Sequence, residues 1–200
     1  LGRTLVFATG ANPRNLGLAQ EQTLVGRGIH YCAACDGMFY RGKTVVLVGG
    51  GNSAAAEALH LSRLAEKVIL VHRRDTLRAT KIYHQPLMDA ENVEFRWNSS
   101  VMELLADGRL TGLRVQNLKT GEESILECEG LFVSIGRSPN TGLVQGQLEL
   151  DGAGYIVADE STRTSLPGVF AAGDCTGQPL QLAKAVGQGQ LAAHWALAGI

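Results

Sequence analysis

The stretch TVVLVGGGNSAAAEALHLSRLAEKVILV, Thr44–Val71, decides the fold. It opens with β-prone residues that show no polar alternation, as expected for a strand buried on both faces. Three glycines follow, then a run with apolar residues at helical spacing, and then a second buried strand at Val68–Val71. This order predicts a βαβ unit with a right-handed crossover, in which Asn52 or Ser53 caps the helix. The fold class is therefore α/β with a Rossmann-like parallel sheet.

The glycine turn matches a dinucleotide-binding pattern. Gly49, Gly51 and Ala54 fit G-x-G-x-x-[GA], and the strand before the turn and the helix after it supply the required context. Gly49 permits the tight turn, Gly51 lets a pyrophosphate approach the backbone, and Ala54 lets helix and strand pack closely. The pyrophosphate would meet free N–H groups at the positive end of the helix. The alternative is a glycine-rich turn without a ligand.

A basic cluster follows the second strand, where an NAD site would place an acid. The residues are His72, Arg73 and Arg74, and Arg78 comes shortly after them. Arginines offer forked, charge-assisted donors to a 2′-phosphate, so the cluster favours NADP over NAD. Without the glycine pattern, a solvated basic turn would be the default interpretation. We expect Asp75 to face away or to pair with an arginine.

The segment IHYCAACDG, Ile29–Gly37, contains a CxxC pair followed by an aspartate. A zinc site needs four ligands, and neither Cys128 nor Cys175 belongs to a second pair. A buried inert pair stays open as an alternative. A reversible disulfide served by an adjacent carboxyl group fits the position beside a nucleotide unit better. His30 is close enough in sequence to tune Cys32, yet a lone histidine is more often an ordinary polar residue, so it is assigned no role.

Composition excludes several classes of protein. The 200 residues carry a net charge of −1 and are 45% hydrophobic, so no strong field of one sign directs the chain to nucleic acid or to a membrane. No apolar run is long enough to span a bilayer, and no signal peptide is visible. One CxxC and two scattered cysteines favour a cytoplasmic protein over a secreted disulfide scaffold. Further strands are expected within residues 4–8, 92–97, 100–105, 110–118, 124–128, 131–135, 155–157 and 169–172, and a helix over 182–197.

Five motifs together carry a family resemblance. They are CAACDG, GGGNSA, HRRD, FVSIGRSPNT and GVFAAGDC, in this order along the chain. The set resembles the low-molecular-weight thioredoxin reductases, flavoproteins of the pyridine nucleotide-disulfide oxidoreductase family. Each motif is moderately specific at best, but the combination is highly specific and runs across essentially the whole chain. The resemblance implies an enzyme that passes electrons from NADPH through FAD to the CxxC pair and on to thioredoxin or a similar small dithiol protein.

The resemblance also implies residue roles. Cys32 attacks the protein disulfide, Cys35 faces the flavin, and Asp36 donates a proton. The NADPH site comprises Gly49, Gly51, Asn52, Ser53, Ala54 and Glu57, with His72, Arg73, Arg74 and Arg78 at the phosphate end. Asp174 accepts a hydrogen bond from the ribityl chain of FAD, and Gln181 and Leu182 lie by the isoalloxazine ring. The remaining cofactor contacts are Thr9, Gly10, Ile135, Gly136 and Gly173.

The chain departs from the family pattern in two respects. The first third of the family, with its own GxGxxG for FAD, is absent, and Leu180 stands about where the family has the arginine of an Arg-Gln-Ala triplet. We therefore expect a partial FAD domain in two pieces, 1–23 and 132–200, around an intact NADPH domain at 24–131, with hinges near 24 and 132. A homodimer is implied. A non-catalytic NADP-binding module and a reductase of a peroxiredoxin-type partner stay open as alternatives.

Overall fold

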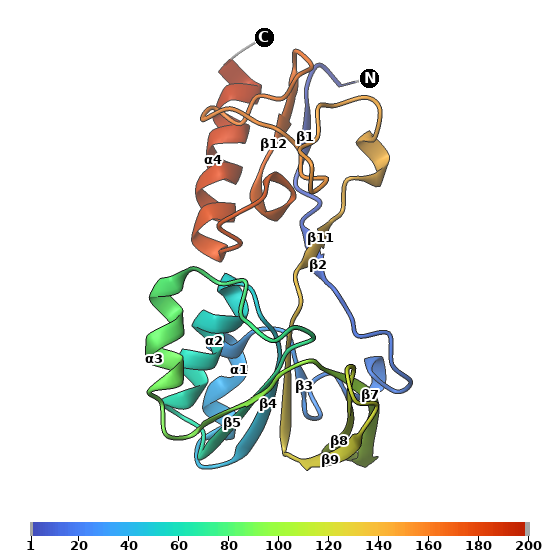
Figure 1. Cartoon of the computed structure of the whole chain (residues 1–200). Coiled ribbons are helices and arrows are strands. Elements are labelled where there is room, and N and C mark those ends of the chain that lie inside the picture. The colour runs from blue at the N-terminus through green and yellow to red at the C-terminus, as the bar shows by residue number, and fades with distance from the viewer. Residues whose placement is uncertain (1, 199–200) are drawn as a thin grey trace. The chain divides into compact units, whose positions relative to one another are not determined.

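A computed structural model describes residues 2–198, and these divide into two compact units (Figure 1). One unit is continuous and comprises residues 13–136, and the other combines residues 2–12 with 137–198. The sequence placed these boundaries after residues 23 and 131 instead. The expected ranges 1–23 and 132–200 also include residues 1, 199 and 200, which lie outside the described part.

A buried carboxylate explains why the 13–136 unit begins earlier than expected. Glu21 is 2% exposed, and its oxygens accept the backbone N–H groups of Leu16, Gly17 and Leu18 and the hydroxyl of Tyr31. Leu16 and Leu18 also pack against the core of this unit. The loop before residue 24 is thereby attached to the 13–136 unit.

The 13–136 unit is built on a five-stranded parallel sheet. Its order is β3 (Ile29–His30), β10 (Gly130–Ser134), β4 (Thr44–Gly49), β5 (Lys67–Val71) and β6 (Val93–Arg96). Helix α2 (Asn52–Ser62) joins β4 to β5, which confirms the expected βαβ unit. The other helices of this unit are α1 (Ala33–Asp36) and α3 (His84–Met88).

Side chains of the central strands alternate between two cores. The unit is three-layered (Figure 1). One face of β4 and β5 packs against α2, and the residues of this face are Val45, Leu47, Val68 and Leu70. The opposite face packs against an antiparallel sheet of β7 (Ser99–Asp107), β8 (Arg109–Asn117) and β9 (Glu123–Glu127). Burial on both faces explains why these strands lack polar alternation. The expected α/β, three-layer architecture is confirmed.

The second unit is organised around a short parallel pair. Strand β1 (Leu5–Phe7) pairs with β12 (Val169–Ala171), and α4 (Leu182–Ala198) packs on them through Ala192. Strands β2 (Ala11–Pro13) and β11 (Arg137–Pro139), which pair with each other, lie at the connections to the 13–136 unit. The strand expected at 155–157 is reduced to an isolated bridge from Ile156 to Leu150. Within residues 2–198, no helix has the length and apolar character needed to cross a bilayer.

Candidate active site

The two cysteines of the CxxC segment are bonded to each other. Cys32 and Cys35 form a disulfide whose Cα atoms lie 5.3 Å apart. Cys32 caps α1, and its sulfur accepts the backbone N–H of Cys35 at 3.1 Å. Cys35 is exposed and Cys32 is half-buried, so a reductant or a partner disulfide can reach the pair from the surface of this unit. The disulfide is thus not buried in an apolar core.

Asp36 belongs to a chain of three hydrogen-bonded side chains. Its Oδ2 lies 2.9 Å from Nδ1 of His30, and Nε2 of His30 lies 2.7 Å from the hydroxyl of Tyr40. His30 and Tyr40 are buried, whereas Asp36 is one-third exposed. The sequence predicts no role for His30, because its position two residues before Cys32 is the only feature that points to a contact with the CxxC segment. The contact with Asp36 depends on how β3 and α1 are placed.

Three consecutive glycines are required for three different reasons. A Cβ on Gly49, whose φ is +155°, would lie 2.3 Å from the Ser134 carbonyl oxygen and 2.7 Å from Cβ of Ala54. A Cβ on Gly50 would lie 2.2 Å from the ring of His72. A Cβ on Gly51 would meet no atom within 4 Å. Gly49 and Gly50 therefore allow close packing within the protein, while Gly51 leaves room outside it for a ligand.

The N-terminus of α2 lies beside that free space. Gly51 is the N-cap, and no side chain caps the helix, so the expectation that Asn52 or Ser53 caps it is wrong. Asn52 is already the first helical residue, and its Oδ1 instead accepts the N–H of Thr80 at 2.7 Å. The unpaired N–H groups and the dipole of an eleven-residue helix favour an anion at this position. Ser53 is exposed and Glu57 is half-buried on the same helix.

The basic loop after β5 is tied to the glycine turn. The Gly50 carbonyl accepts the N–H groups of Arg78 at 2.7 Å and Ala79 at 3.2 Å. Arg73, Arg74 and Arg78 are exposed, and none of the three forms an ion pair within residues 2–198. The loop that is tied to the glycine turn therefore carries three exposed cations without ion-pair partners in the described part of the chain.

Asp75 does not neutralise this cluster. Its Oδ2 lies 3.0 Å from Nζ of Lys119, and this contact lowers the pKa of the Asp75 carboxyl group. Of the two alternatives expected for Asp75, pairing with an arginine is wrong, because its carboxylate is directed to Lys119. The reason is that Leu118 N–H bonds to the Asn98 carbonyl, which anchors the β8–β9 turn beside the basic loop. The arginines are left available for an anionic ligand.

His72 is enclosed behind the turn rather than exposed beside the arginines. Burial lowers its pKa, and the charges of Arg78, Arg73 and Arg74 lower it further, which favours the neutral imidazole. Nε2 of His72 is buried and has no hydrogen-bond partner within the described part of the chain. Its ring occupies the space that a Gly50 side chain would need, so it supports the turn from behind.

The second unit brings two glycine-containing segments to one edge of its strand pair. Because β1 and β12 are parallel with Phe7 opposite Ala171, Thr9–Gly10 and Gly173–Asp174 both follow the carboxyl ends of neighbouring strands. Ligands of α/β sheets bind at such edges. Asn140 ties the first segment through its amide to the Thr9 carbonyl and through its N–H to the Gly10 carbonyl, each at 2.9 Å. Gln181 and Leu182 are exposed at the start of α4, and Ile135 and Gly136 follow β10 in the other unit.

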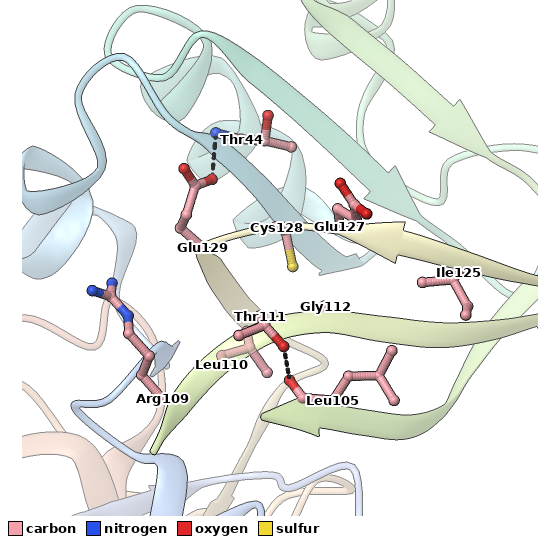
Figure 2. A pocket seen from close by; sticks show the side chains of 10 residues that line it. All are labelled: Thr44, Leu105, Arg109, Leu110, Thr111, Gly112, Ile125, Glu127, Cys128 and Glu129. Atoms are coloured by element: carbon pink, nitrogen blue, oxygen red, sulfur yellow. Dashed lines mark hydrogen bonds between the residues drawn. The ribbon is translucent and has the colours of Figure 1, made fainter. Parts of the chain in front are cut away.

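A groove of about 730 Å³ is lined by none of the residues assigned to the site from the sequence (Figure 2). It is lined by residues of β4, β7, β8 and β9 and by the two residues that follow β9, Cys128 and Glu129. Burial raises the pKa of the Cys128 thiol to about 12, and Glu129 adds to the effect. Cys128 and Cys175 are both buried and serve packing, as the sequence indicated.

The glycine turn, the arginine cluster and the accessible disulfide now stand within one unit. Residues 2–189 match the family described as pyridine nucleotide-disulphide oxidoreductase. The chain belongs to this family. Within the family, its similarity is to proteins named thioredoxin reductase, and the chain is a homologue of them.

Three members of the family illustrate the extent of the match. A thioredoxin reductase of Listeria monocytogenes is 45% identical over 192 residues, which are 95% of this chain and 60% of that protein. One of Streptomyces coelicolor is 47% identical over 173 residues, 86% of this chain and 54% of that protein. The crystal structure of the Streptococcus pyogenes thioredoxin reductase superposes with a TM-score of 0.87 at 40% identity, covering 98% of this chain and 64% of that one. The chain therefore spans about 60% of such relatives.

Proposed function

We propose that the chain is part of an NADPH-dependent flavoprotein disulfide reductase. Electrons would pass from NADPH through FAD to Cys32–Cys35 and then to thioredoxin or a similar small dithiol protein. The observation that carries the proposal is an accessible disulfide beside Asp36, in the same unit as an uncapped helix N-terminus surrounded by unpaired arginines. The relatives' names support thioredoxin as the partner.

The nucleotide would be held at the glycine turn. The free space at Gly51 admits the pyrophosphate, and the first-turn N–H groups of α2 bind it. Arg73, Arg74 and Arg78 bind the 2′-phosphate through charge-assisted hydrogen bonds. In the other unit, Thr9–Gly10 and Gly173–Asp174 contribute to the FAD site. When bound, NADPH would supply the hydride and FAD the electron pair that a disulfide can accept.

The protein's own sulfurs carry out the exchange. Opening the Cys32–Cys35 disulfide consumes two electrons and two protons and leaves a dithiol. The Cys32 thiolate then attacks the partner's disulfide, and one partner sulfur leaves with a proton. Cys35 attacks Cys32 in the mixed disulfide, which releases the second partner sulfur and restores the starting bond. Asp36 holds the proton that Cys35 loses and regains in these steps.

The proposal includes movement and assembly. The nicotinamide and the dithiol cannot both contact one face of the flavin, so the 13–136 unit would rotate about the segments that contain β2 and β11. We also propose a homodimer, by likeness to the family. A cytoplasmic location fits the free thiols of Cys128 and Cys175, which a reducing compartment preserves.

The test is NADPH-dependent thiol release with thioredoxin as acceptor and FAD present. It is run on this chain and on a chimera that adds the N-terminal third of the Listeria monocytogenes relative. The chimera should be yellow and active, and its Cys35→Ser variant should still transfer hydride to flavin but should not reduce thioredoxin. Turnover of thioredoxin by the serine variant would disprove the assigned role.

The same preparations separate the alternatives. A colourless chimera that binds NADPH without releasing thiols supports a non-catalytic NADP-binding module. A yellow chimera that reduces a peroxiredoxin-type protein but not thioredoxin supports the alternative of a reductase for a peroxiredoxin-type partner.

A further inference from the structure

The role proposed for Asp36 raises the question of where its proton comes from. A carboxyl group that donates to a thiolate must be protonated again before the next turnover. We propose that His30 fixes the Asp36 carboxyl group in place and stores the proton that Asp36 passes to the Cys35 sulfur. This inference rests on the proposed function, because it deepens the part that Asp36 plays there.

The imidazole of His30 is held from three sides. Asp36 contacts Nδ1 at 2.9 Å, Tyr40 contacts Nε2 at 2.7 Å, and Phe132 stacks on the ring with centroids 5.4 Å apart. The stacking follows from the sheet, since His30 on β3 is in register with Phe132 on β10. His30 is only 9% exposed, so its ring cannot turn away without breaking both hydrogen bonds. One edge of the imidazole is thus permanently presented to the carboxyl group.

Tyr40 serves as the partner of Nε2 while the ring gives up a proton at Nδ1. In the imidazolium form both nitrogens donate, Nδ1–H to Asp36 and Nε2–H to the Tyr40 oxygen. When the Nδ1 proton has passed to Asp36, the ring is a neutral imidazole that keeps its Nε2–H on the Tyr40 oxygen. The hydroxyl keeps its own proton because burial raises the pKa of Tyr40. The other charged or titratable groups near Tyr40 are Lys43, whose Nζ lies 5.5 Å from the centre of the Tyr40 ring, and Arg109, Cys128 and Glu129, all of the same unit.

The transfer balances in protons and electrons. Breaking the disulfide takes up an electron pair from the reductant and leaves a thiolate on each sulfur, of which Cys32 exchanges its proton with solvent. Asp36 gives its proton to the Cys35 sulfur and receives the Nδ1 proton of the His30 imidazolium, which becomes a neutral imidazole. His30 is then reprotonated from solvent through Asp36, which is 33% exposed and is the open end of the chain. The imidazole suits this task because it is the side chain that ordinarily exchanges protons near neutral pH.

The test uses this chain without nucleotide or flavin. Cys32→Ser leaves Cys35 as the exposed thiol, while Cys128 and Cys175 are buried and do not compete. The rate of iodoacetamide alkylation is measured from about pH 5 to about pH 10, a range that spans the ordinary pKa values of histidine and cysteine. We expect two inflections, one from the thiol and one from the His30–Asp36 pair. Only the thiol inflection should remain when one of three further substitutions is added to Cys32→Ser: His30→Asn, His30→Gln or Asp36→Asn.

The two replacements of His30 distinguish its role in positioning Asp36 from its role in storing a proton. Asparagine places an N–H near the position of Nδ1 and can still bond Asp36, whereas glutamine reaches toward the position of Nε2. The midpoint of the thiol inflection reports the nearness of the Asp36 carboxylate, because a negative charge disfavours the thiolate. His30→Asn should leave the midpoint of the thiol inflection at the pH found for the Cys32→Ser parent. His30→Gln should shift this midpoint by about half a pH unit or more. The control is His194→Gln, an exposed histidine of the other unit, which should change neither inflection.

A single inflection in the Cys32→Ser parent overturns the proposal, and so do two inflections in the His30 variants. If His30→Gln does not fold by circular dichroism, His30→Asn and Asp36→Asn decide the matter alone. Because the assay contains no cofactor, these outcomes are independent of whether the chimera reduces thioredoxin. A lack of thiol release would refute the proposed function and leave the proton chain standing.

Discussion

Neighbouring glycines in one turn should respond to the same substitution in opposite ways. Gly49→Ala adds a methyl group 2.3 Å from the backbone oxygen of Ser134, and the φ of +155° is unfavourable for a residue with a side chain. Gly51→Ala adds the same methyl group where no protein atom lies within 4 Å. The first change should therefore damage the fold, and the second should damage ligand binding.

The magnitudes follow from these contacts. Overpacking against fixed backbone costs about 1–3 kcal/mol, and the strained φ adds about 1–3 kcal/mol, so Gly49→Ala should lower the free energy of unfolding by about 2–6 kcal/mol. Gly51→Ala loses only a helix N-cap preference, about 0.5–1 kcal/mol. If its methyl group meets the pyrophosphate, the Kd for NADPH should rise at least about tenfold, which is about 1.4 kcal/mol.

Urea unfolding and a titration of NADPH fluorescence measure the two effects on the same preparations. The expected result is a Gly51→Ala variant that unfolds nearly like the parent but binds NADPH weakly. Wild-type affinity in Gly51→Ala would refute the placement of the pyrophosphate at the N-terminus of α2. Equal loss of stability in both variants would refute the reasoning from the contacts.

Three further predictions concern charges and pKa shifts. Arg73→Gln with Arg74→Gln should weaken NADPH binding at least about tenfold but NADH binding less than about twofold in fluorescence titrations, because only NADPH has the 2′-phosphate. Arg63→Gln, an exposed arginine at the end of α2, serves as the control. Glu21→Gln should lower the free energy of unfolding by about 1.5–3 kcal/mol, since a buried carboxylate accepts four hydrogen bonds, whereas the exposed Glu122→Gln should stay within about 0.5 kcal/mol. Burial, and then Glu21, raise the pKa of Tyr31, so its contribution to stability is present below the unfolded value of about 10 and is lost as pH rises above it. Between about pH 9 and about pH 11, urea unfolding should show a steeper loss for the parent than for Tyr31→Phe, at most about 1.4 kcal/mol per pH unit.

The sheet and its layers were predictable because the signal is local. Val45 to Val48 are all apolar, which indicates burial on both faces, and the glycines fix where the strand gives way to a helix. The dinucleotide-binding pattern also explains why positions 49 and 54 carry small residues. A Cβ on Gly49 would lie 2.7 Å from Cβ of Ala54. Local sequence patterns were therefore sufficient to predict both the fold and the position of the glycine turn.

Contacts between distant residues were not predictable. Lys119 meets Asp75 across 44 positions of sequence, and no single-sequence pattern pairs them. His30 is near Asp36 in sequence, but their contact depends on Tyr40 and on Phe132 of a strand about a hundred residues away. The unit boundary was displaced because Glu21 binds backbone N–H groups, and acceptors of this kind leave no periodicity to detect.

The paired ends of the 13–136 unit bear on the order in which the chain acquires its structure. The N–H of Arg14 bonds to the carbonyl of Gly136 at 3.0 Å, so this unit starts and finishes at one place, as an insertion into a host domain must. On the ribosome it can mature as soon as residue 136 has emerged. Strand β1 is made before this unit and its partner β12 after it, so their pairing must wait until the whole 13–136 unit has been synthesised.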